Sequence, residues 1–293
     1  MKLSVAVDHG VTLRVRHRPG GDGRPFLLLH GLRSNARMWD DVADRLVAAG
    51  HPVYALDMRG HGDSDLPKHG YDNATATADL VAVCRELRLT GALLAGHSWG
   101  GNLAVRLVAE HPEVAAGLAL VDGGWISMVD TSQGGPAREK VVEMVGRAHS
   151  QVSGMTAQTL RETLRGLHPT WSAAAVEATL ADLAEGPDGL LVPRLPLEKL
   201  LSILESMWED PPARWYPAIT VPVMLCSTLP VQVPMLSDLA RKWVAEVEAA
   251  LPQADPRWYV GADHNVHADH PARVAGDLLD LAATVDKPAS ERP

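Results

Sequence analysis

The chain has 293 residues, of which 46% are hydrophobic and 22% charged, which is typical of one folded domain with an insertion and excludes a disordered or fibrous protein. The net charge of −9 disfavours a nucleic-acid binder, because such proteins need a basic surface to neutralise phosphates. The longest apolar runs have the length of a strand, whereas a bilayer span needs about twenty residues, so we expect no membrane span.

The first ten residues, MKLSVAVDHG, lack a basic region followed by an apolar run. We therefore expect no secretory signal and a cytoplasmic location. The segments LSVAV and VTLRVRH alternate around Asp8-His9-Gly10, which predicts a two-stranded hairpin. The two cysteines, Cys84 and Cys226, fall in an apparent amphipathic helix and an apparent buried strand, where we expect reduced core residues.

Short apolar runs separated by segments of helical periodicity follow the hairpin. This alternation indicates βα units, so the predicted fold class is α/β, with a mostly parallel central sheet flanked by helices. The apolar runs are Phe26–His30, Val53–Asp57, Ala92–Gly96, Leu118–Asp122 and Val221–Ser227.

The strand rhythm stops after Asp122, and several helical segments with Gly and Pro breaks follow. We predict a core domain made of residues 1–122 and 218–293, with a helical cap at 123–217 inserted into it. Trp125, Met128 and Trp208 belong to this cap. Such side chains suit the apolar wall of a substrate pocket, and packing in the core of the cap is the open alternative.

The motif Gly96-His97-Ser98-Trp99-Gly100-Gly101 lies between the apolar run ALLAG and the helical pattern NLAVRLVAEH. A G-x-S-x-G sequence at a strand-to-helix junction is typical of a nucleophile elbow. The glycines allow a strained turn and the close passage of neighbouring chains. The turn leaves the serine at a helix N-terminus, where the dipole favours an anionic intermediate. The motif therefore predicts Ser98 as a nucleophile.

Three further segments resemble those of the cap-bearing α/β-hydrolases: His30-Gly31-Leu32, the loop from Asp57 to Ser64 with its D-x-R-G-x-G-x-S pattern, and Gly261-Ala262-Asp263-His264. That superfamily includes esterases, lactonases, C–C bond hydrolases, epoxide hydrolases and haloalkane dehalogenases. The resemblance covers about residues 25 to 285 and implies the α/β-hydrolase fold, while the cap offers no comparable match. It also implies an oxyanion hole formed by the backbone N–H groups of Leu32 and Trp99.

His97 and Trp99 flank the nucleophile in the epoxide hydrolase and dehalogenase branches as well. Those branches require an aspartate where this chain has Ser98, so their alkyl-enzyme chemistry is disfavoured. We expect His97 at the substrate pocket. For the Trp99 side chain, a pocket wall and packing under the cap both remain open.

A serine hydroxyl is a poor nucleophile near neutral pH and needs a base. His264 is the candidate, because it follows an apolar strand late in the chain, where the resemblance places the base. His267 is read as a loop residue and His270 as the start of the last helix. His30 is expected to organise the oxyanion turn, and His61 to be structural within its loop.

The commonest position for the third member of the triad, just after the strand that follows the cap, holds no acid in Val221–Pro230. Some members of the fold take the acid from the end of the preceding strand, where this chain has Asp122. Its role would be to hold the tautomer of His264 and to stabilise the imidazolium. Asp238 is the alternative acid, and Asp263 is poorly aimed because it is adjacent to His264.

These residues predict a serine hydrolase that cleaves a carboxylic ester or lactone of a medium-sized hydrophobic substrate through an acyl-enzyme on Ser98. Two alternatives stay open, a C–C bond hydrolase with the same triad and a non-catalytic ligand-binding protein of this fold. No cofactor is expected. No metal is expected either, because no companion segment supplies ligands beside the late histidines. We expect a monomer or a homodimer with no nucleic-acid partner.

Overall fold

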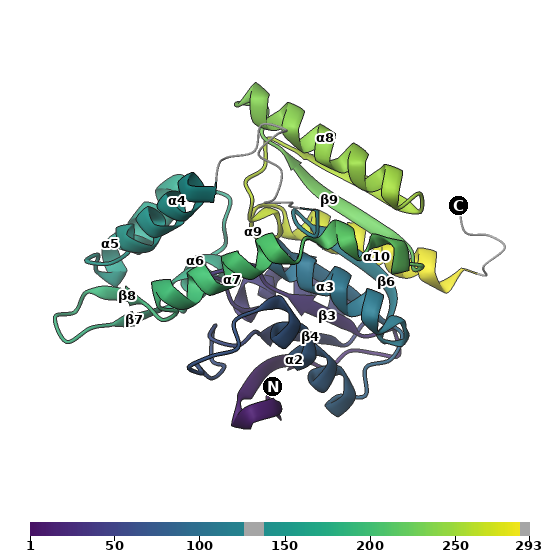
Figure 1. Ribbon diagram of the computed structural model, residues 1–293, viewed down its shortest axis with the longest axis horizontal. Helices are drawn as coiled ribbons and strands as arrows, with labels where there is room; N and C mark the ends of the chain where they lie inside the picture. Colours follow the sequence, from purple (N-terminus) through teal and green to yellow (C-terminus); the bar gives the residue numbers. More distant parts are fainter. Residues whose placement is uncertain (126–137, 288–293) are drawn as a thin grey trace.

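The computed structural model describes residues 1–125 and 138–287, which form a central sheet between layers of helices (Figure 1). The eight strands follow the order β1-β2-β4-β3-β5-β6-β9-β10. β2 pairs antiparallel with β1 and β4, and the remaining pairs are parallel. The predicted α/β fold class is therefore confirmed. The strands are β1 (Lys2–Ala6), β2 (Thr12–Arg18), β3 (Phe26–Leu29), β4 (Val53–Asp57), β5 (Ala92–His97), β6 (Ala115–Val121), β9 (Val223–Leu229) and β10 (Ala254–Val260).

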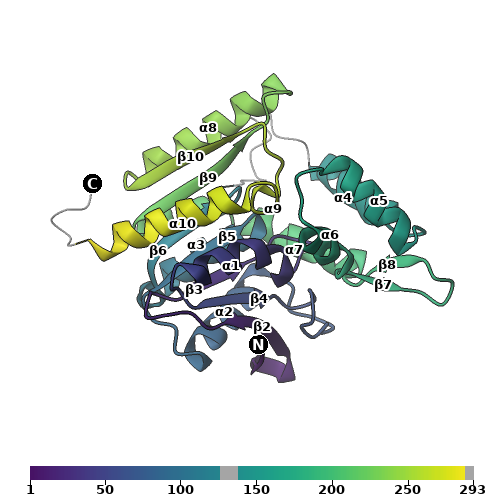
Figure 2. The same cartoon turned by 180° about the vertical axis from the view of Figure 1, so that it is seen from behind.

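Helices cover both faces of the sheet. One face packs against α1 and α10, and Figure 2 shows these two helices side by side in front of the sheet. The other face packs against α2, α3 and α8. Both α1 and α10 bury an apolar stripe and expose a polar one, as surface helices do. The helices of the two layers are α1 (Asp40–Ala48), α2 (Asn73–Glu86), α3 (Trp99–Glu110), α8 (Pro234–Ala250) and α10 (Pro271–Asp286), and a short α9 (Val266–Asp269) precedes α10.

The central parallel strands are apolar along nearly their whole length. β3 and β5 are buried at every position, because helices cover both of their faces. Cys84 on α2 and Cys226 on β9 are buried free cysteines, as expected. The predicted N-terminal hairpin is also present, and its turn is a 3-10 helix at Asp8–Gly10.

The segment between β6 and β9 contains helices, as predicted, and also a small hairpin that the sequence reading missed. Its helices are α4 (Arg138–Gln151), α5 (Ala157–Leu167), α6 (Ala173–Leu180) and α7 (Leu197–Glu209). The hairpin pairs β7 (Leu183–Glu185) with β8 (Leu191–Pro193). Three residues per strand are too few for the alternation of polar and apolar side chains to stand out. In Figure 1 this inserted segment extends to one side of the sheet.

None of the helices in residues 1–125 and 138–287 combines the length and the apolar character needed to cross a bilayer.

Candidate active site

Ser98 lies at the sharp turn between β5 and α3. Its backbone has φ 52° and ψ −121°, a conformation that is strained for a residue with a side chain. The backbone N–H of Ser98 donates to the carbonyl of Val121, at 3.1 Å. A methyl group on Gly123 would overlap the Ser98 backbone, and one on Gly100 would overlap the carbonyl of His30. These close approaches explain why glycines surround the serine and keep it at the N-terminus of α3.

Asp122 lies directly after β6 and contacts His264. The carboxylate Oδ2 is 2.6 Å from His264 Nδ1. The other oxygen, Oδ1, accepts from both the backbone N–H and the hydroxyl of Thr228, at 3.0 and 2.9 Å. Thr228 lies on β9, next to the position after this strand at which the sequence resemblance leads one to expect the acid. β9 therefore supplies the donors that orient the carboxylate, while β6 supplies the carboxylate itself.

The two alternative carboxylates lie elsewhere. Asp238 is exposed on α8 and makes no hydrogen bond with His264 among the described residues. Asp263 precedes His264, but its carboxylate is 3.0 Å from Nδ1 of His168. Of the candidates weighed from the sequence, only Asp122 is thus brought into hydrogen-bond contact with His264.

The His264 ring is polarised by its acidic neighbours. Partial burial acts to lower the pKa of His264, but the hydrogen bond and the charge of Asp122, with a smaller effect of Asp263, raise it above the ordinary value. Because Nδ1 faces the carboxylate, it carries the hydrogen of the neutral ring and leaves the lone pair on Nε2. About half of the His264 side chain is exposed.

Two buried histidines lie beside His264. His97 Nε2 donates to the backbone carbonyl of His264, at 2.9 Å, and the ring centroids are 4.7 Å apart. The ring of His267 lies 4.4 Å from that of His97. Burial lowers the pKa of His97 well below its ordinary value and that of His267 to about 3, so both rings are neutral. The sequence predicts His97 in the pocket lining, but the structure buries it under the His264 loop, because its hydrogen bond to that loop draws it inward.

The turn that carries Leu32 lies against the serine elbow. A methyl group on Gly31 would be 3.0 Å from the Cβ atom of Ser98. Within residues 1–125 and 138–287, neither the Leu32 nor the Trp99 N–H donates to a backbone carbonyl outside the regular elements. Unpaired backbone donors beside the serine are what an oxyanion hole requires.

Histidines brace this turn from behind. His30 Nδ1 donates to the carbonyl of Gly31 at 2.7 Å, and its Nε2 accepts from Met58 N at 3.0 Å. His61 Nε2 accepts from the backbone N–H of Arg33 at 3.3 Å. Burial lowers the pKa of His61 to about 4, so the neutral ring can serve as this acceptor. The expected supporting roles of His30 and His61 agree with these contacts.

The D-x-R-G-x-G-x-S loop stabilises the same region. The Asp57 carboxylate accepts from the backbone N–H groups of Ala36 and Asp63, at 2.7 and 3.0 Å. Arg59 makes a buried bidentate ion pair with Asp79 on α2, with both contacts at 2.6 Å. These bonds tie the loop after β4 to the turn after β3 and to α2.

The Trp99 side chain packs under the inserted segment. Its indole N–H donates to Asn73 Oδ1 at 3.0 Å, and Asn73 N donates to the hydroxyl of Ser206 on α7 at 2.7 Å. The indole is 1% exposed. Of the two alternatives left open for the Trp99 side chain, the structure therefore favours packing under the inserted segment. Asn73, which the sequence analysis did not single out, connects Trp99 to Ser206 of that segment.

A cavity of about 190 Å³ lies beside the Asp122 and His264 pair, lined also by Trp125 and by Trp243 of α8. The sequence reading missed Trp243, because only the tertiary fold brings α8 to this position. Trp208 lies apart, half-buried on α7 with the Arg138 guanidinium 4.9 Å above its ring. The remaining expected pocket residue, Met128, lies outside the described residues.

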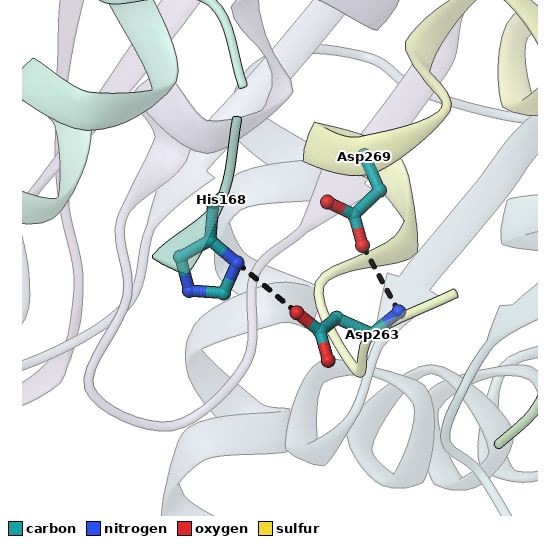
Figure 3. A group of neighbouring side chains, drawn as sticks. All are labelled: His168, Asp263 and Asp269. Carbon is teal, nitrogen blue, oxygen red and sulfur yellow. Dashed lines mark hydrogen bonds and ion pairs between the residues drawn. The ribbon is translucent and has the colours of Figure 1, made fainter. Parts of the chain in front are cut away.

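The loop that carries the candidate base also contacts the inserted segment, as Figure 3 shows. His168 Nδ1 lies 3.0 Å from Asp263 Oδ2, and Asp263 N donates to Asp269 Oδ2 at 3.0 Å. Asp269 Oδ1 accepts from the indole of Trp171 at 2.7 Å. Ligand atoms of His168, Asp263 and Asp269 fall within 4.8 Å of one another, as in some metal sites. Protein donors nevertheless occupy both oxygens of Asp269, so the group serves as a connection between the two segments.

The sequence and the fold of this chain are similar to those of known proteins. The chain is 42% identical over 91 residues to the AB hydrolase superfamily protein YisY of Bacillus subtilis, which is 31% of this chain and 34% of that protein. It is 30% identical over 200 residues to Epoxide hydrolase A of Mycobacterium tuberculosis, which is 64% of this chain and 61% of that protein. The matched regions thus span less than two thirds of these relatives.

A solved structure extends the similarity to nearly the whole chain. The crystal structure of E-2-(acetamidomethylene)succinate hydrolase has a TM-score of 0.77 and 22% identity, and covers 97% of this chain and 99% of that one. The profile of the family described as "Alpha/beta hydrolase family" matches residues 26–278. The chain therefore belongs to the alpha/beta hydrolase family.

Proposed function

We propose that this protein is a serine hydrolase that cleaves a carboxylic ester or a lactone. Ser98 would be the nucleophile, His264 the base and Asp122 the acid of the triad. The observation that carries the proposal is the 2.6 Å contact between Asp122 and His264 Nδ1, in a loop hydrogen-bonded to the residue that precedes Ser98. This contact orients the free lone pair of the ring for proton transfer.

The proposed reaction has two halves. In the first, Ser98 Oγ attacks the carbonyl carbon while His264 Nε2 takes the hydroxyl proton. The N–H groups of Leu32 and Trp99 stabilise the oxyanion, and His264 returns the proton to the leaving alkoxide. In the second half, water attacks the acyl-enzyme with the same base, and Ser98 leaves. The charge of Asp122 stabilises the imidazolium that forms in each half.

The residue at the elbow separates this proposal from epoxide opening. Epoxide hydrolases of this fold form an ester on an aspartate, and this chain carries Ser98 at that position. A serine attacking a carbonyl gives an acyl-enzyme that water can hydrolyse, which suits esters and lactones. The similarity to Epoxide hydrolase A therefore supports the fold and the elbow, and the serine supports the ester chemistry.

A panel of 4-nitrophenyl esters, lactones and a 1,5-diketone tests the reaction class. We expect turnover of esters or lactones, and a loss of roughly four to six orders of magnitude in Ser98→Ala. Asp238→Asn is the matched control and should keep the wild-type rate. A fluorophosphonate probe should label Ser98, as identified by mass spectrometry of the peptide. Labelling at another residue, or full activity of Ser98→Ala, would refute the proposal, and cleavage of the diketone alone would favour C–C hydrolysis.

A further inference from the structure

A second cavity lies between the core domain and the inserted segment. Its volume is about 60 Å³, which is enough for a few water molecules or one carboxylate group. The core contributes Arg33 and the loop of His61, and the inserted segment contributes His149, Asp182 and Arg194. We call it the Arg33 cavity.

The Arg33 cavity lies close to the proposed nucleophile. Arg33 comes directly after Leu32, whose N–H is proposed for the oxyanion hole. Because Gly31 abuts Ser98 and two residues span at most about 7.6 Å, the Cα atom of Arg33 lies within about 12 Å of the Ser98 Cβ atom. A small molecule with its carbonyl at Ser98 is long enough to span this distance with a second group, although Ser98 itself does not line the cavity.

Arg33 is held in an unusual conformation and has unused donors. Its φ of 57° lies in the left-handed region, which residues with side chains adopt rarely and often at functional sites. The half-buried guanidinium donates one hydrogen bond, from Nη2 to the carbonyl of Ala148 at 3.3 Å. In the part of the chain that the structure describes, it makes no direct ion pair with a carboxylate, and the charge of Asp182 acts on it from a longer distance. Burying a cation without an ion-pair partner is costly, so the geometry leaves room for an anion.

The other polar groups of the cavity leave it positively charged. Arg194 also makes no ion pair within the described ranges. His149 Nδ1 is buried without a hydrogen-bond partner, and burial and the charge of Arg33 lower the pKa of this histidine. Asp182 is the one carboxylate among the described residues that line the cavity. Burial raises its pKa to about 7 while the charges of Arg194 and Arg33 favour its ionised form, and even when ionised it balances only one of the two arginine charges.

Apolar side chains complete the lining. Val152, Leu160, Leu183 and Leu195 surround the charged groups. An apolar wall with a few convergent polar groups is the usual construction of a small-molecule site. The guanidinium fork matches a carboxylate better than any neutral group of this size.

We propose that the Arg33 cavity binds a carboxylate of the substrate, so that the substrate is an ester or lactone that also carries an acidic group a few carbons from the carbonyl attacked by Ser98. This inference rests on the proposed hydrolase function. It narrows the expected substrate from a purely hydrophobic molecule to an amphipathic acid.

Two esters that differ in one charge test the proposal. The acidic ester is mono-4-nitrophenyl glutarate, and the neutral one is its methyl ester. We expect wild type to have the higher kcat/KM for the acidic ester. Arg33→Met should lower that value about 10- to 100-fold while changing the neutral ester less than about threefold. Arg33→Lys should recover part of the preference. Arg37→Met is the matched control, because Arg37 lies one turn further on and faces Asp63.

A binding measurement separates this proposal from the hydrolase function. Calorimetric titration of glutarate into Ser98→Ala should show binding that is weakened at least about tenfold by adding Arg33→Met. If neither ester is cleaved but glutarate binding depends on Arg33, the anion site stands and the ester chemistry falls. If both esters are cleaved and Arg33→Met and Arg33→Lys, checked for folding by circular dichroism, keep the wild-type ratio, the Arg33 cavity proposal is overturned.

Discussion

Replacing Asp122 by asparagine tests the proposed triad most directly. Thr228 donates two hydrogen bonds to Oδ1 of Asp122, so the asparagine carbonyl must take that position. Its NH₂ group then faces Nδ1 of His264, which has to become the acceptor. The hydrogen of the ring moves to Nε2, and the base can no longer accept the proton of Ser98.

The expected magnitude follows from this exchange of tautomers. We expect kcat to fall by about 10⁴-fold, or about 5.5 kcal/mol of activation free energy. The fold should survive, because the two bonds from Thr228 are kept. The assay is hydrolysis of the best 4-nitrophenyl ester, with Asp238→Asn as the control and thermal unfolding as the check on stability. A folded Asp122→Asn variant with more than about a tenth of the wild-type kcat would refute this reasoning.

Three further outcomes follow from the same contacts. Activity should rise with pH through a single ionisation above 6.5, because the hydrogen bond and the charge of Asp122 raise the pKa of His264 and only the neutral ring accepts a proton. The measurement is the pH profile of kcat/KM for wild type and for Asp122→Asn. An ionisation that Asp122→Asn does not shift downward would contradict this reasoning. Gly123→Ala should inactivate the enzyme and lower its melting temperature, since the new methyl group overlaps the Ser98 backbone. Gly146→Ala, in α4 with open space around it, should keep the activity and should not lower the melting temperature, because alanine favours the helix. Arg59→Met should lower the free energy of unfolding, measured in urea, by about 3–5 kcal/mol, because it leaves Asp79 buried and unpaired. If the double variant Arg59→Met/Asp79→Leu regains no stability, loss of the ion pair is not the cause.

The sequence alone determined the features that depend on local pattern. Strand-length apolar runs separated by helical periodicity predict a parallel sheet, because each element must bury its own face. The elbow was predictable for a similar reason, since the glycines around Ser98 are required by close backbone contacts that leave a readable motif. His264 was predicted as the base from its place after the last strand.

Only the tertiary structure distinguished between side chains that the local sequence pattern supports equally as site residues. Asp122 and Asp238 both lie near strand ends or helix starts, and the pairing of β6 with β9 brings Asp122 to Thr228 and on to His264. The packing of the Trp99 side chain against Asn73 was likewise visible only in the tertiary structure. The Arg33 cavity was visible only there too, because its walls come from segments more than a hundred residues apart. Periodicity records which face of an element is buried. Which side chains meet across elements depends on strand register and packing, which no local pattern encodes.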